Sequence, residues 1–71
     1  MSDTEIDEYI KYDQEVETLM QKAKELKARG IDTTDVEFEL KLARDKISQT
    51  MFTMSKTYID SAKARLAKLG G

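Results

Sequence analysis

The chain has 71 residues, of which 39% are hydrophobic and 37% are charged, a length that fits one small domain. It contains no Cys and no His, which excludes disulfides and Cys- or His-based metal sites and removes the usual acid–base catalyst at neutral pH. Its net charge of −2 has the wrong sign for a protein that mainly binds phosphate backbones. A chain this rich in charge yet still periodic is typical of long helices and coiled coils.

The location of the protein is predicted from two absences in the sequence. No apolar run approaches the roughly 18 residues that a membrane span requires. The first five residues, Met-Ser-Asp-Thr-Glu, are acidic, whereas a secretory signal is basic and then apolar. We therefore expect a soluble, cytoplasmic protein without a membrane segment.

A first helix is predicted over about residues 3–28. Ser2 and Glu5 have the spacing of a capping box at its start, and Gly30 suits the left-handed position that closes a helix. Its apolar positions step alternately by three and four residues, as in a coiled-coil seam. These positions are Tyr9, Tyr12, Val16, Leu19, Ala23 and Leu26. One face of this helix is therefore expected to pack against a second helix.

The turn is predicted over about residues 29–34 and a second helix over about 35–69, all within one domain, 1–71. Thr34 and Glu37 repeat the capping-box spacing, and Gly70-Gly71 would end the helix. Its apolar positions follow an eleven-residue repeat, which favours a nearly straight pairing of helices. They are Val36, Leu40, Ala43, Ile47, Met51, Met54, Tyr58, Ala62 and Leu69, with Arg65 as an interruption.

Charge predicts that the two helices run antiparallel. Residues 2–17 carry −6 and residues 18–31 carry +3, whereas residues 32–45 carry −3 and residues 46–71 carry +4. Folding the chain back at the turn places blocks of opposite sign side by side. The predicted fold is therefore all-α, an antiparallel, coiled-coil-like two-helix hairpin.

Two helices alone cannot enclose a core, so we expect the hairpin to dimerise into a four-helix bundle. Several large apolar residues fall outside the predicted seam, and the nine residues Ile47–Ser55 carry no charge in a highly charged chain. A solvated neutral patch is the alternative interpretation of this stretch. The candidate oligomer or partner interface comprises Phe38, Leu42, Met51, Phe52, Met54, Ile59 and Leu66.

No pattern in the sequence predicts catalysis, a cofactor or a metal site. Ser48 and Ser55 have only Lys46 and Lys56 as candidate bases, and a lysine-activated serine needs a pocket that two helices do not supply. The acidic residues near the N-terminus lack the spacing of a calcium loop. We therefore expect a protein without enzymatic activity.

Two functions from different classes are compatible with these observations. The first is a self-associating helical interaction module that presents helix faces to a protein partner. The alternative is a small nucleic-acid-associated protein that uses the basic end of the second helix, where Lys56, Lys63, Arg65 and Lys68 lie. The acidic start of the first helix would compete for these same cations, which favours the first function.

Overall fold

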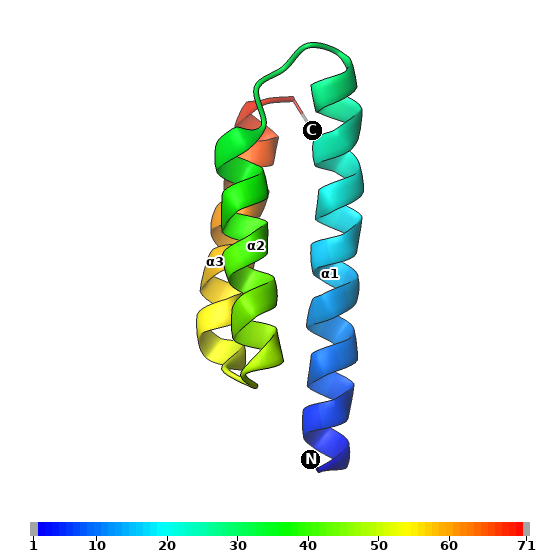
Figure 1. The fold of residues 1–71 in the computed structure, drawn as a ribbon, viewed down its shortest axis with the longest axis vertical. Coiled ribbons are helices and arrows are strands. Elements are labelled where there is room, and N and C mark those ends of the chain that lie inside the picture. The colour runs from blue at the N-terminus through cyan, green and yellow to red at the C-terminus, as the bar shows by residue number, and fades with distance from the viewer. Residues whose placement is uncertain (1, 71) are drawn as a thin grey trace.

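The computed structural model describes residues 2–70, which form three α-helices and no strand: α1 (Asp3–Ala28), α2 (Thr34–Ser48) and α3 (Phe52–Lys68). Figure 1 shows that α2 runs antiparallel to α1, and that α3 folds back along α2 and so runs parallel to α1. With 26 residues, α1 is much longer than α2 and α3, and its N-terminal end projects beyond the α2–α3 turn. Within this part of the chain, no helix is long and apolar enough to cross a membrane.

The structure thus differs from the predicted two-helix hairpin in one respect. The segment predicted as one helix over 35–69 is broken at residues 49–51, and α3 packs on α1 and α2 of its own chain. The uncharged stretch Ile47–Ser55 spans this break, and both of its end residues are buried inside the bundle. Between these two ends, every residue except the half-buried Phe52 is exposed at the turn from α2 to α3.

Both turns have the hydrogen bonds of a Schellman motif, in which a left-handed residue ends the helix. After α1, Gly30 has φ +86° and the N–H of Ile31 donates to the carbonyl of Leu26 over 3.1 Å. After α2, Thr50 has φ +57° and the N–H of Met51 donates to the carbonyl of Lys46 over 2.9 Å. The second turn is therefore the same device as the first, built on threonine where glycine is usual.

Thr50→Gly is expected to stabilise the protein by about 1 kcal/mol. A β-branched residue in the left-handed region is strained, whereas glycine adopts this conformation readily. Urea denaturation followed by circular dichroism measures the change. The control is Gln49→Gly. Because Gln49 has φ −94°, a conformation that any residue adopts, glycine at this position should destabilise the protein by making the unfolded chain more flexible. A Thr50→Gly protein that is no more stable than the parent would contradict the strained turn.

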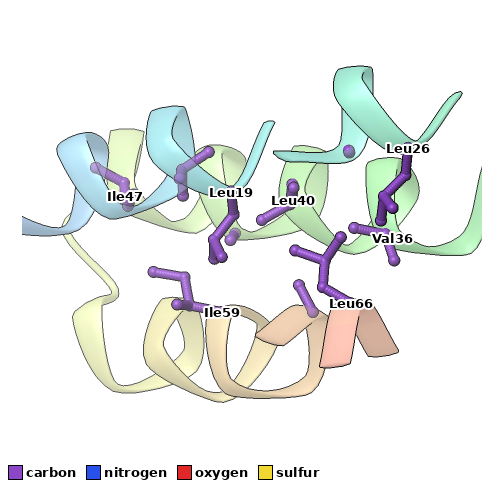
Figure 2. Packing of buried hydrophobic residues seen from close by; sticks show 11 residues of the cluster. Leu19, Leu26, Val36, Leu40, Ile47, Ile59 and Leu66 are labelled. Atoms are coloured by element: carbon purple, nitrogen blue, oxygen red, sulfur yellow. The ribbon is translucent and has the colours of Figure 1, made fainter. Parts of the chain in front are cut away.

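The core lies along the axis between the three helices, and its buried hydrophobic side chains are all aliphatic (Figure 2). Its members are Val16, Leu19, Ala23 and Leu26 from α1, Val36, Leu40, Ala43 and Ile47 from α2, and Ile59, Ala62 and Leu66 from α3. The alanines, one from each helix, allow the backbones to approach closely, and the larger residues fill the remaining space. Three helices of one chain therefore enclose this core without a partner.

The apolar face of α3 differs by one position from the predicted seam. Ser55, Ile59, Ala62 and Leu66 face the core, whereas the eleven-residue repeat placed Met54 and Tyr58 there. The break causes this shift. Because the left-handed residue turns the chain, the periodicity of the apolar positions in α2 does not continue into α3. Ile59 and Leu66, predicted on the outer surface, are consequently buried at 0% and 2% exposure.

Candidate interaction surface

Large exposed apolar residues gather at one end of the molecule. Ile6, Tyr9 and Ile10 are 42%, 37% and 48% exposed on the projecting end of α1, by which we mean residues 3–11. Met51 and Met54 are 39% and 41% exposed at the α2–α3 turn, which lies at the same end. We call these five residues the apolar end. Such a concentration of exposed apolar side chains is typical of a binding surface.

An aromatic pair fixes the turn against α1 at the base of the projecting end. The rings of Tyr12 and Phe52 stack with their centroids 5.9 Å apart and their planes 25° apart, and both side chains are half-buried. Phe52, predicted to pack on a second chain, therefore packs on its own chain, because the break brings the start of α3 next to α1. Sequence analysis missed Ile6, Tyr9 and Ile10 as surface residues, since the predicted second helix was long enough to cover them.

The apolar residues of the projecting end form a stripe that carries acids on both edges. At about 100° per residue, Ile6 and Ile10 lie about 60° and 100° round the helix from Tyr9, all on one side. Glu5 lies about 40° from Tyr9 on the other side, and Asp3 follows Ile10. Residues 2–10 contain four acids and no Lys or Arg, and none of these acids forms an ion pair within residues 2–70. The stripe is therefore apolar and strongly negative.

Further along α1, the same stripe is contacted by Arg44 of α2. Asp13 and Glu17 continue the stripe, and Arg44 of α2 reaches them at 3.4 Å and 3.3 Å. Because α2 ends at Ser48, no helix within residues 2–70 runs beside the projecting end of α1. The projecting end of α1 therefore extends beyond the end of α2 and has no helix packed beside it.

The other predicted interface residues lie apart from the apolar end. Phe38 is 61% exposed on α2, and Leu42, one turn later on the same face, is half-buried. No other large exposed apolar residue of the described chain accompanies Phe38 on α2. A single exposed aromatic residue is common on protein surfaces, so Phe38 serves as a comparison position rather than as part of the apolar end.

The cations of α3 are mostly paired with acids. Lys56 pairs with Asp60 at 2.8 Å, and Lys63 pairs with Glu15 of α1 at 3.1 Å. The ion pair raises the pKa of Lys56, first through its hydrogen bond to Asp60 and then through the attraction of that charge. These cations are therefore held by the chain itself and not gathered as a free basic face.

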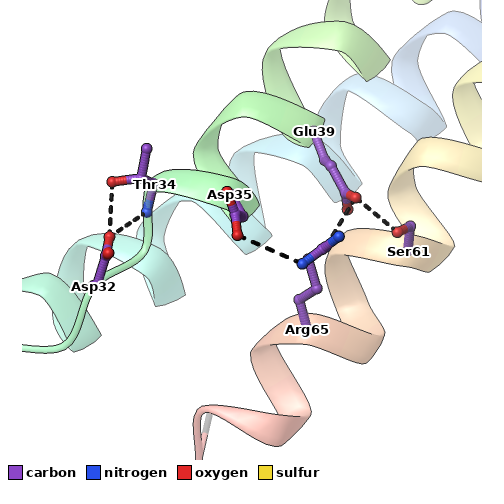
Figure 3. Close-up of polar contacts among 6 residues, drawn as sticks. All are labelled: Asp32, Thr34, Asp35, Glu39, Ser61 and Arg65. Atoms are coloured by element: carbon purple, nitrogen blue, oxygen red, sulfur yellow. Dashed lines mark hydrogen bonds and ion pairs between the residues drawn. The ribbon is translucent and has the colours of Figure 1, made fainter.

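Arg65, which interrupted the predicted seam, connects α3 to α2 (Figure 3). Its Nε donates to Glu39 Oε1 over 2.9 Å, and its Nη1 lies 3.7 Å from Asp35 Oδ2. The hydroxyl of Ser61 donates to the same Glu39 oxygen over 2.9 Å. An arginine at this position thus bridges two helices and fixes their register without entering the core.

The described residues form two hollows that could be considered for a small ligand. One of about 160 Å³ beside Arg65 is lined by Asp32, Asp35, Val36, Lys68 and Leu69, and one of about 300 Å³ near the end of α1 is lined by Lys22, Glu25, Leu26, Arg29 and Gly70. Pockets for small molecules usually measure about 300–1,000 Å³ and are largely apolar, whereas the first hollow is smaller and the second is lined mostly by charged residues. Within residues 2–70, no three acidic side chains come together as a metal site would require. The apolar end is therefore the stronger candidate for a binding surface.

Acid is expected to destabilise the fold. Asp32 Oδ1 accepts hydrogen bonds from the N–H of Thr34 over 3.0 Å and from its hydroxyl over 2.7 Å, and the backbone bond is the main cause that lowers the pKa of Asp32. The pKa of Glu17 is lowered by hydrogen bonds from Gln21 and Arg44. A carboxyl group whose pKa is lower in the folded state than in the unfolded state stabilises the fold at pH values above its unfolded pKa of about 4. This stabilisation is lost as the pH falls through the pKa of the folded state.

Urea denaturation at pH values between about 7 and 2 measures this loss. Asp32→Ala should lower the free energy of unfolding at neutral pH and flatten its decline in acid, because the variant has one fewer perturbed carboxyl group. An equal effect of Asp32→Ala at both ends of the pH range would contradict the role given to the Asp32 charge.

The comparisons with known proteins provide no family from which a function could be transferred: no protein-family model, no curated protein and no solved structure matches the chain.

Proposed function

We propose that this protein is a non-enzymatic helical interaction module that binds a helix of a protein partner through its apolar end. The observation that carries the proposal is the exposed stripe of Ile6, Tyr9 and Ile10 on a helix whose neighbour ends early. A partner helix would remove these side chains from water and lie in line with α2. Burial of about 25 cal/mol per Å² of apolar surface is the main driving force for such an association.

Completion of the core no longer requires a second chain. The sequence predicts a dimer because two helices cannot enclose a core and because several large apolar residues fall outside the seam; of these residues, Ile59 and Leu66 lie in the core of their own chain. The proposed interaction surface is therefore smaller than the sequence alone suggests, and it lies at one end of the bundle.

The pairing of the α3 cations favours protein binding over nucleic-acid binding. A nucleic-acid site needs clustered Lys and Arg residues that are free to contact phosphates. Lys56, Lys63 and Arg65 instead contact acids on α3, α1 and α2. Retention of the protein on a DNA column that weakens steeply with salt would favour the nucleic-acid function over the proposed one.

Capture experiments with matched variants test the proposed function. The immobilised protein is exposed to a lysate of its native cells, and any captured protein is then purified and titrated against the chain. Ile6→Ser/Ile10→Ser should abolish both capture and the purified interaction, whereas Phe38→Ser, the same change at an exposed position outside the apolar end, should leave both intact. Binding by Ile6→Ser/Ile10→Ser with the same affinity as the parent protein would overturn the proposal.

A further inference from the structure

We infer that the partner of the apolar end is a basic amphipathic helix, an inference that rests on the proposed function and specifies its ligand. The apolar stripe of α1 has Glu5 along one edge and Asp3 along the other. A helix lying on this stripe would contribute its own apolar residues to Ile6, Tyr9 and Ile10. Its flanking residues would then lie beside carboxylates on both sides, where Lys or Arg is favoured and Asp or Glu is repelled.

The contacts made by α2 further along α1 provide a template for this arrangement. There Arg44 reaches across from α2 to Asp13 and Glu17, which occupy the same stripe of α1. The partner helix would occupy the place of a continued α2 and repeat this pairing of a cation with the acids of α1. Since the acids of residues 2–10 form no ion pair within the described chain, they are available for it.

A second copy of the chain is the less favourable occupant of this surface. In a two-fold pair of projecting ends, the acids beside the stripe of one copy, Asp3 and Glu5, would lie near those of the other. Lys11 is the first cation along the chain, and its ammonium lies over the Tyr12 ring, 5.4 Å from the centroid. Like charges at a small interface oppose association, whereas a basic helix neutralises them.

The test uses two synthetic amphipathic peptides with the same leucine stripe, one carrying Lys and the other Glu at the flanking positions. Each is titrated into the ¹⁵N-labelled protein, and the amide shifts of residues 3–11 are followed by NMR. We expect the Lys peptide to bind at least about tenfold more tightly than the Glu peptide, and its affinity to fall as salt is raised.

Two matched pairs of variants separate the apolar and the electrostatic contributions. Ile6→Ser/Ile10→Ser should weaken binding of the Lys peptide at least about tenfold, whereas Phe38→Ser should not change it. Asp3→Asn/Glu5→Gln should weaken it several-fold and reduce its salt dependence, whereas Glu25→Gln, at an exposed acid near the opposite end of α1, should have no effect.

The possible outcomes distinguish the inference from the proposed function. Equal binding of both peptides, still lost in Ile6→Ser/Ile10→Ser, would overturn the basic partner and leave the interaction module standing. Self-association in sedimentation equilibrium that is lost in the same double variant would replace the basic helix by a second copy. Failure of both peptides to bind, in a protein that also captures no partner through Ile6 and Ile10, would overturn both proposals.

Discussion

Ile59→Ala should destabilise the protein by about 2–5 kcal/mol, which lowers its melting temperature by about 10 °C or more. Ile59 is fully buried in the three-helix core, so the truncation removes apolar contacts and leaves a cavity. Its neighbours belong to the same chain, so the loss should be the same at every protein concentration. Thermal unfolding measured by circular dichroism over a wide range of concentration tests both statements.

Ile10→Ala is the matched control for this experiment. It makes the same kind of truncation on the projecting end of α1, where the side chain is 48% exposed, and should change stability by less than about 0.5 kcal/mol. A melting temperature of the parent protein that rises with concentration would show that the folded unit is an oligomer. If this dependence persisted in Ile6→Ser/Ile10→Ser, it would restore the bundle of two chains and contradict a core enclosed by one chain.

Ser55→Leu is expected to destabilise the protein by about 1–3 kcal/mol or more, because it places a large side chain where two helices meet closely. Ser55 is fully buried near the start of α3, and its hydroxyl donates to the carbonyl of Ala43 on α2 over 3.1 Å. The hydroxyl is thus satisfied, and the small volume of the residue allows the approach. Urea denaturation should show the loss directly.

Two controls separate volume from polarity at this position. Ser55→Ala keeps the small volume and removes only the hydrogen bond, so a cost of about 1 kcal/mol or less is expected. Thr53→Leu enlarges an exposed residue of α3 and should be nearly neutral. If Ser55→Leu were as well tolerated as Thr53→Leu, α2 and α3 would not be closely packed at this level.

The parts of the fold that sequence predicts best are those with strong local signals. The α1 helix spans Asp3–Ala28, the residues expected from its periodicity, and its N-cap Ser2 accepts a hydrogen bond from the N–H of Glu5 over 3.2 Å. The left-handed Gly30 lies where the only internal glycine predicted a turn. Here the residue type and the backbone conformation agree, so the pattern is sufficient.

The break between α2 and α3 could not be predicted in the same way. Thr50 is a residue type that avoids the left-handed region, and its neighbours continue the apolar repeat across the break. The gain from burying Ile59 and Leu66 against α1 and α2 outweighs this local strain, and it appears only when three helices are placed together. The exposure of Ile6 and Ile10 follows from the same break, so the candidate site could not be predicted from the sequence either.

The two short turns have a consequence for how quickly the molecule acquires its structure. Each successive helix packs on the one before it, and the paired residues of α2 and α3 are separated by short stretches of chain, as in the hydrogen bond of Ser55 to Ala43. Closing such small loops costs little chain entropy, and helical domains dominated by sequence-local contacts fold in microseconds to milliseconds. The time spent with an exposed, half-assembled core is correspondingly brief, which limits the opportunity for aggregation of this small chain.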